Sequence, residues 1–575
     1  MLAQRNMFYK TKIEALQEVL DTLRSDMISE DRNGQSRAIT LFMAHLFRLL
    51  SIHKKPPKPW DQNLLYRPNS EICYGKPKSC NAAIKNYLDD LMKEIDDRLV
   101  FFRLLELMIH LDDRLGYIKT APPTDESEVF KGSDGLQGFI LHWKPWAEMN
   151  PEQPRSLSLR KLAEERREKK NGAPIHNDLM DPVDFLKHVF MIDLTTIEPT
   201  CNIRIIDLNH FGPNEKWADT LSEGLAKGKF KIAFCPMHQE KAPLKDLKTC
   251  FIAEMFHDAN GGNPNSGIFY ADTTRPSLDQ NEISTYIQEL FDELKEEEVD
   301  LVLLPELMVA SPTLEQIKDI LKQQSYSSHI IKGVVAGSFH HYEPVEGESP
   351  LVNQAEFLNQ YGDSVSVHLK TYQFHMALSD FERFSETDKQ HITSKPPKEN
   401  KLVTSRDQNK VFEYIRKGNC LNVLETSLGR LSFVICADAI HNPQLIKLCR
   451  VARLDALFIL AMSSKTSKFD SVQQADFDAY GINGFFVNTS PYCGPNENLA
   501  YFHGVLEELS HDGLKNRIFW KTPGKDSGTT STLTFQDGSE LANTSAYYLT
   551  SSKKSLIVDL GQFLVEGRSK EKNAQ

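Results

Sequence analysis

The chain is 575 residues long, which exceeds one ordinary domain, so two or more domains are expected. Hydrophobic residues make up 40% of it and charged residues 25%, a composition typical of globular proteins. The net charge of −12 argues against a general nucleic-acid binder. No run of about 18 apolar residues occurs, so neither a transmembrane helix nor a membrane partner is predicted.

The nine cysteines are scattered along the chain and odd in number. This pattern fits a reducing compartment better than a disulfide framework, and it predicts a cytoplasmic protein. The sequence has no CxxC pair and no Cys/His cluster at zinc spacing, so no metal site is predicted. The first residues, 1–6, lack the apolar core of a signal peptide.

Residues 1–225 are predicted to form a mostly helical domain. Apolar residues recur at helical spacing over residues 10–23, 39–50, 83–92 and 99–115. A polar, proline-containing linker is predicted at residues 120–135. This part of the chain carries no motif that assigns a role, so an oligomerisation module, a docking module for a protein partner and a lid all stay open.

Residues 228–565 are predicted to form a second domain, in which short apolar runs alternate with helical segments. Strands are expected at residues 230–236, 334–340, 454–461, 483–490 and 554–560, with an amphipathic helix at residues 284–295. Alternation of this kind indicates a layered α/β fold. Residues 240–280 are polar and are expected to form loops within an insertion.

Three predicted strands of this second domain each end at a chemically reactive residue. The run 299–306 ends in Glu306, the run 364–370 ends in Lys370, and the apolar run 431–435 is followed at once by Cys436. The carboxyl ends of strands in a layered α/β fold gather at one edge of the sheet, where ligands bind. We therefore expect these three side chains to meet in one site.

These residue types suit one kind of chemistry. A cysteine at the end of a buried strand is held rigidly and left open on one side, as a nucleophile requires. A desolvated carboxylate can serve as general base, and an ammonium group can stabilise a tetrahedral oxyanion. Each residue also has an ordinary structural interpretation, as a packed core cysteine, a helix-cap glutamate or an exposed lysine at a strand end.

The three stretches together resemble the motifs of the nitrilase, or carbon-nitrogen hydrolase, superfamily. The resemblance consists of the Pro-Glu that closes the strand at Glu306, the lysine after a short strand at Lys370, and the sequence Gly-Arg-Leu-Ser-Phe-Val-Ile-Cys-Ala-Asp at residues 429–438. It extends over about residues 228–565. It implies a four-layer αββα sandwich, which usually pairs through its helices into dimers or larger homo-oligomers.

The resemblance also implies a role for each residue. Cys436 would be the nucleophile that forms a thioester, Glu306 the general base and Lys370 the stabiliser of the oxyanion, with the backbone N–H of Ala437 as a second donor. No metal ion and no organic cofactor would be needed.

Many members of the superfamily carry a second glutamate in the loop after the lysine. Glu382 is the candidate for it here, and Glu386 is the other residue considered.

The substrate would be a small-molecule amide or nitrile. True nitrilases usually carry Trp-Glu after the cysteine, whereas this chain has Ala437 and Asp438 there, so hydrolysis of an amide is favoured over that of a nitrile. A second hypothesis is a nitrilase-like sensor, effector or scaffold subunit of a larger assembly, such as a bacterial antiviral one, docked through its N-terminal helices. The complete set of Glu306, Lys370 and Cys436 favours the enzyme.

Overall fold

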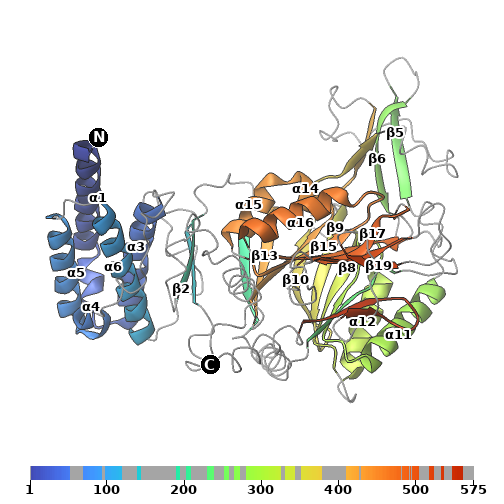
Figure 1. Cartoon of the computed structure of the whole chain (residues 1–575), viewed down its shortest axis with the longest axis horizontal. Coiled ribbons are helices and arrows are strands. Elements are labelled where there is room, and N and C mark those ends of the chain that lie inside the picture. The colour runs from blue at the N-terminus through green and yellow to red at the C-terminus, as the bar shows by residue number, and fades with distance from the viewer. Residues whose placement is uncertain are drawn as a thin grey trace. The chain divides into compact units, whose positions relative to one another are not determined.

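The structure is a computed structural model, and its chain divides into two compact units (Figure 1). Unit 1 comprises Met1–Arg155 and Arg167–Glu198, and unit 2 comprises Ser156–Arg166 and Pro199–Gln575. The residues described below are 2–51, 69–93, 97–118, 139–143, 189–193, 202–208, 230–237, 251–257, 264–271, 280–324, 330–342, 351–377, 409–426, 429–452, 454–480, 482–490, 493, 495–503, 517–522, 532–535 and 547–560. The predicted linker at 120–135 lies outside them.

Unit 1 is built mainly from helices in its described part. These are α1 (Leu2–Thr22), α2 (Arg24–Met27), α3 (Arg32–Ser51), α4 (Ser70–Tyr74), α5 (Pro77–Leu91) and α6 (Asp97–Ile118). The antiparallel strands β1 (Phe139–Trp143) and β2 (Val189–Asp193) follow. The expected helical faces at 39–50 and 99–115 fall within α3 and α6, and those at 10–23 and 83–92 end one residue beyond α1 and α5. Leu107 and Met108 of α6 are fully buried, because this helix contributes its long apolar stretch to the core of the unit.

An eight-stranded sheet forms one half of unit 2 in the part that the structure describes, in the order β19-β18-β17-β16-β15-β14-β13-β3. Its strands are β3 (Asn202–Asp207), β13 (Cys420–Thr426), β14 (Gly429–Ile435), β15 (Ala456–Ala461), β16 (Asn483–Asn488), β17 (Asn498–His503), β18 (Arg517–Lys521) and β19 (Thr532–Phe535). Strands β14, β15 and β16 are parallel, so their carboxyl ends lie at the same edge. Because β3 pairs with β13, this sheet includes a strand that precedes the expected domain start at residue 228.

A seven-stranded sheet forms the other half, in the order β10-β9-β8-β7-β4-β21-β20 among the described residues. Its strands are β4 (Lys231–Phe234), β7 (Leu301–Leu303), β8 (Gly333–Tyr342), β9 (Leu351–Asn359), β10 (Ser364–Leu369), β20 (Tyr547–Leu549) and β21 (Leu556–Asp559). Helices α11 (Gln280–Glu296) and α12 (Ser311–Gln323) cover its outer face through a continuous apolar cluster that includes Ile287, Leu290 and Ile317. The strands and helix expected in this region therefore form.

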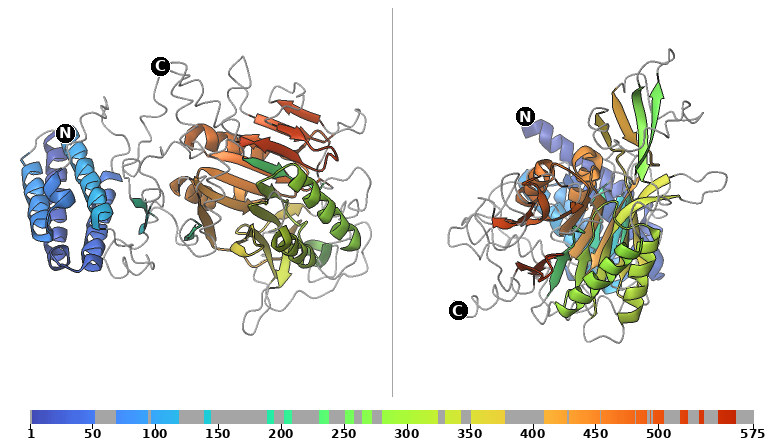
Figure 2. Two further views of the ribbon diagram at one scale, coloured as in Figure 1. Left: turned by 90° about the horizontal axis from the view of Figure 1, so that it is seen from below. Right: turned by 90° about the vertical axis from the view of Figure 1, so that its right-hand side faces the viewer.

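The two large sheets pack face to face, with helices on both outer sides (Figures 1 and 2). The ring of Phe234 on β4 stacks on that of Phe485 on β16, with centroids 6.0 Å apart. The neighbouring Phe486 points the opposite way and contacts Phe469 of α16 (Ser467–Tyr480), as alternation along a strand requires. Helices α14 (Asp438–His441), α15 (Pro443–Val451) and α16 lie on this second side. The arrangement is thus helix, sheet, sheet, helix.

A third, four-stranded sheet has the order β11-β12-β6-β5 in the described structure. Its strands are β5 (Phe251–His257), β6 (Pro264–Ala271), β11 (His375–Ala377) and β12 (Lys410–Glu413), and Figure 1 shows β5 and β6 extending beyond the two large sheets. The expectation of loops over residues 240–280 is therefore wrong where β5 and β6 form. The sheet depends on a parallel pairing of β6 with β12, a partner so distant in sequence that local periodicity does not reveal it.

We expect the buried aromatic side chains of the eight-stranded sheet to contribute strongly to the stability of unit 2. Phe485 is fully buried, and its ring centroid lies 4.8 Å from those of Phe458 and Phe502. Phe485→Ala should lower the free energy of unfolding by about 3–5 kcal/mol, because it leaves a cavity in a packed interior. Urea denaturation measures this loss. Val367→Ala, at a side chain that is 41% exposed, is the control, and an equal effect of both changes would contradict the prediction.

Candidate active site

Cys436 lies immediately beyond β14 in a conformation that few non-glycine residues adopt. Its φ is 45°, so the chain turns sharply here from the strand towards α14. The Cys436 N–H donates to the carbonyl oxygen of Leu460 at 2.8 Å, which fastens the turn to β15. The thiol is thereby fixed at the carboxyl edge of the eight-stranded sheet, where only 5% of the residue is exposed.

Glu306 is held at the same edge by contacts from both large sheets. Its backbone carbonyl accepts a hydrogen bond from Thr489 Oγ1 at 2.6 Å, and Thr489 follows β16 of the opposite sheet. Beside it, a Cβ atom on Gly337 of β8 would lie 1.9 Å from the carbonyl oxygen of Pro305. Only glycine therefore lets β8 approach the segment that carries Glu306.

Lys370 directly follows β10, and its backbone N–H donates to the carbonyl oxygen of Asn353 at 2.9 Å. Its Nζ lies 2.7 Å from Glu306 Oε1. The thiol of Cys436 donates to the carbonyl oxygen of Met462 at 3.9 Å, and the N–H of the same Met462 donates to Glu306 Oε2 at 3.0 Å. The structure thus brings together the three residues that the sequence analysis selected, in a buried site.

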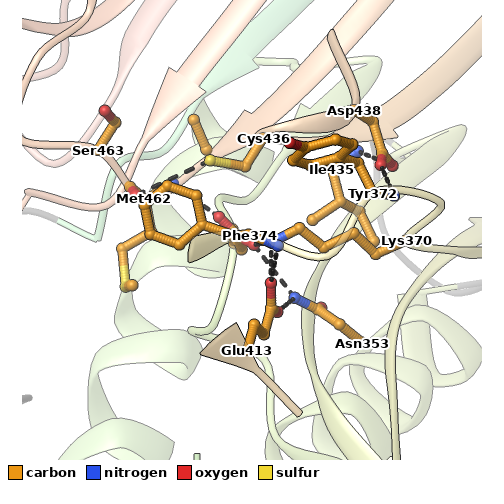
Figure 3. A network of polar contacts seen from close by, with 12 residues as sticks. Asn353, Lys370, Tyr372, Phe374, Glu413, Ile435, Cys436, Asp438, Met462 and Ser463 are labelled. Atoms are coloured by element: carbon orange, nitrogen blue, oxygen red, sulfur yellow. Dashed lines mark hydrogen bonds and ion pairs between the residues drawn. The ribbon is translucent and has the colours of Figure 1, made fainter. Parts of the chain in front are cut away.

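A further carboxylate, that of Glu413, completes the ion-pair network. Lys370 Nζ lies 2.7 Å from Glu413 Oε2, and Asn353 Nδ2 donates to Glu413 Oε1 at 2.9 Å and to Glu306 Oε1 at 3.1 Å (Figure 3). The Lys370 ammonium is therefore paired with two carboxylates, and the side-chain amide of Asn353 donates to both of them.

The sequence analysis did not identify Glu413. It placed the second glutamate at Glu382 or Glu386, and both lie outside the described residues. The sequence does carry a pattern that points to Glu413, because this residue ends the short strand Lys410–Glu413 just as Glu306 follows its own strand. Glu413 is easily missed because it lies far beyond Lys370 along the chain.

Burial and neighbouring charges set the proton affinities in the site. Burial, together with the charge of Glu413, raises the pKa of Glu306 although Lys370 opposes this. Burial and the charge of Glu306 likewise raise the pKa of the Cys436 thiol well above its usual range. Burial alone would lower the pKa of Lys370, but the two carboxylates raise it. The resting site therefore holds a protonated thiol beside a carboxylate of increased proton affinity, next to a permanent cation.

The pKa of Glu413 is shifted in the opposite direction. Burial alone would raise it, but the Lys370 ammonium and the hydrogen bond from His340 lower it to about 2. Glu413 is therefore a carboxylate at neutral pH, and its negative charge holds the Lys370 ammonium in place.

Asp438, two residues after Cys436, binds the residues that directly follow Lys370. Its Oδ1 accepts from the Thr371 N–H at 2.9 Å, from Thr371 Oγ1 at 2.8 Å and from the Tyr372 N–H at 2.6 Å. Its Oδ2 lies 3.1 Å from Nε2 of the fully buried His368 on β10. This carboxylate fixes the separation of Cys436 and Lys370, which belong to different sheets.

Within the residues that the structure describes, no group of three or more His, Cys, Asp or Glu side chains is placed to hold a metal ion. No helix in the described part of the chain has both the length and the apolar character needed to cross a bilayer.

The chain is similar over about 60% of its length to solved structures of the nitrilase superfamily. Nit3 of Saccharomyces cerevisiae, a member of branch 10 of that superfamily, shares 11% identity, with 60% of this chain and 94% of that chain covered and a TM-score of 0.30. An amidase from Nesterenkonia sp. shares 15% identity, covering 56% of this chain and 95% of that one, with a TM-score of 0.28. A glutamine-dependent NAD+ synthetase from Acinetobacter baumannii shares 14% identity, covering 55% of this chain and 48% of that one, with a TM-score of 0.27.

No family model matches the chain, and no curated protein does.

We expect Asp438→Asn to lower the free energy of unfolding by about 3 kcal/mol, because an amide NH₂ would then face donors that now meet a carboxylate oxygen. Asp319→Asn is the matched control, since Asp319 lies on the exposed side of α12 in a surface ion pair with Lys322. Its effect should stay below about 0.5 kcal/mol. Urea denaturation measures both, and equal losses in the two variants would show that Asp438 has no special structural role.

The low pKa of Glu413 predicts how stability depends on pH. The pKa of Glu413 is about 2 in the folded state, against an ordinary value of 4.5. The ionised carboxylate therefore stabilises the folded state fully above pH 4.5. This contribution is lost as the pH falls towards 2. The destabilisation caused by Glu413→Gln should therefore be larger at about pH 7 than at about pH 3 in urea denaturation. Glu289→Gln, in a surface ion pair with Lys554, is the control and should lower the free energy of unfolding by less than about 0.5 kcal/mol. A Glu413→Gln effect of constant size would contradict the assignment.

Proposed function

We propose that the chain is a carbon-nitrogen hydrolase of the nitrilase superfamily that cleaves an amide through a cysteine thioester. The observation that carries this proposal is that the backbone of Met462 joins the Cys436 thiol to the Glu306 carboxylate, which also binds the Lys370 ammonium at 2.7 Å. The helix, sheet, sheet, helix layering agrees with the αββα sandwich that the sequence motifs imply. A nucleophile, a base and a fixed cation are the groups that acyl transfer to cysteine requires.

The first half of the reaction forms the thioester. Glu306 takes the thiol proton, and the Cys436 sulfur attacks the carbonyl carbon to give a tetrahedral intermediate. The Lys370 ammonium and the backbone N–H of Ala437 stabilise its oxyanion. When the intermediate collapses, the C–N bond breaks, and Glu306 returns its proton to the leaving nitrogen, which departs as ammonia or an amine.

The second half restores the enzyme. Glu306 takes a proton from a water molecule, and the resulting hydroxide attacks the thioester carbon. The C–S bond then breaks, and the sulfur recovers the proton from Glu306 as the carboxylic acid leaves. Glu306 thus moves a proton in each half, a task for which its raised proton affinity suits it. Glu413 keeps its charge throughout and prevents Lys370 from acting as a competing acid.

An amide substrate is favoured because the residue after the nucleophile is small. Ala437 precedes α14 and replaces the tryptophan that is usual in true nitrilases. Asp438 likewise stands where those enzymes usually carry glutamate.

We expect 2-chloroacetamide, a small amide that alkylates thiols, to modify Cys436 about tenfold faster than the other cysteines near neutral pH, because Glu306 assists removal of the thiol proton. Peptide mass spectrometry of the intact, folded protein identifies the site and gives the rate. Cys436→Ala should abolish this fast phase, whereas Cys449→Ala, at another buried cysteine, should leave it unchanged. Lys370→Ala should slow it, with circular dichroism confirming that the variant is folded.

Labelling of Cys436 no faster than that of the other cysteines would contradict the proposal. In that case a scaffold or effector role, which needs no activated thiol, would take its place. If Cys436 is labelled rapidly, ammonia release from a panel of amides and nitriles then tests the substrate class, and turnover of nitriles alone would contradict the amide assignment.

A further inference from the structure

Strand β6 of the four-stranded sheet is linked to the candidate active site through His340. Ala271 is the last residue of β6, and its backbone N–H donates to His340 Nδ1 at 2.6 Å. On the other side of the ring, His340 Nε2 lies 2.9 Å from Glu413 Oε1. His340 is on β8 of the seven-stranded sheet and is fully buried. It therefore stands between β6 and the carboxylate that binds Lys370.

The backbone contact determines which ring nitrogen of His340 carries the proton. An amide N–H can only donate, so Nδ1 must be the acceptor and the neutral ring must carry its hydrogen on Nε2. This Nε2–H is directed at Glu413, where it makes a hydrogen bond to a buried carboxylate. Hydrogen bonds to charged groups are among the stronger ones in proteins, and their loss in a buried site is costly.

The contacts of Glu413 divide between its two oxygen atoms. Oε1 accepts from His340 and from Asn353, at 2.9 Å each. Oε2 accepts from Lys370 Nζ at 2.7 Å and from the Phe374 N–H at 3.3 Å. The two neutral side chains thus orient the carboxylate so that its second oxygen faces the ammonium. Without His340, Oε1 would depend on Asn353 alone, and Asn353 is shared with Glu306.

We propose that His340 is a positioning residue, which uses the backbone of β6 to fix its tautomer and so orients Glu413 towards Lys370. This inference rests on the proposed function, because it assigns His340 a part in the same reaction. The four-stranded sheet then helps to build the site, because it supplies both Glu413, at the end of β12, and the Ala271 N–H that orients His340.

Two substitutions separate the two contacts of the ring. The amide nitrogen of glutamine can replace Nε2, so His340→Gln keeps a donor for Glu413 and gives up the acceptor for Ala271. The amide oxygen of asparagine can replace Nδ1, so His340→Asn keeps the acceptor for Ala271 and gives up the donor for Glu413. The probe is again the rate at which 2-chloroacetamide alkylates Cys436 in the full-length protein. Thermal unfolding of each variant is measured in parallel.

We expect His340→Gln to alkylate within about twofold of the unsubstituted protein and His340→Asn to alkylate about tenfold more slowly, because only the latter removes a hydrogen bond from a buried charge. The unfolding temperatures should not follow this order, since each variant loses one contact. Equal rates in the two variants, or a slower rate in His340→Gln, would overturn the inference.

A double-mutant cycle tests whether His340 acts through Glu413. In a Glu413→Gln background, His340→Asn should slow alkylation by less than about twofold, because the group that it orients is already changed. A full tenfold loss in that background would overturn the inference, and this comparison stays informative if His340→Gln proves unstable. Fast labelling of Cys436 in the unsubstituted protein tests the proposed function separately. If that labelling is absent, the proposed function and this inference fail together.

Discussion

The ammonium group of Lys370, buried between two carboxylates at 2.7 Å each, is the interaction on which the rest of the site depends. A buried charge costs several kcal/mol unless it is paired and hydrogen-bonded, so this arrangement tolerates little displacement of its members. Lys370 and Glu306 follow strands of the seven-stranded sheet, while Glu413 ends a strand of the small sheet. The pairing register of both sheets must therefore be correct before the network can form.

Cys436 belongs to the opposite large sheet, so the two sheets must also be fixed against each other at this edge. Asp438, which follows Cys436, fixes the sheets by accepting hydrogen bonds from the residues after Lys370. Thr489, which follows β16, fixes them by donating to the backbone carbonyl oxygen of Glu306. The aromatic contacts between the sheets supply cohesion, whereas these polar contacts set the distances among Cys436, Glu306 and Lys370.

The part of the site that depends on local pattern could be predicted from the sequence. Glu306, Lys370 and Cys436 each follow a short apolar run, and a strand followed by a reactive residue can be recognised without knowing its partner. Glu413 and His340 could not be assigned in this way, because their roles arise from the pairing of β6 with β12 and from the contact of β6 with β8. The start of the eight-stranded sheet at β3 was missed for the same reason, since its pairing with β13 joins distant segments.

The charge network bears on the choice between an enzyme and a scaffold. Replacing buried ionic groups by packed apolar side chains is often neutral or stabilising, so stability alone gives little reason to keep Glu306, Lys370 and Glu413 together. Cys436 adds a conformation with φ of 45°, which is unfavourable for a residue with a side chain. A scaffold would gain from relaxing both features. Their presence at one sheet edge, with the Cys436 thiol and the Glu306 carboxylate joined through the backbone of Met462, is something that folding alone does not require.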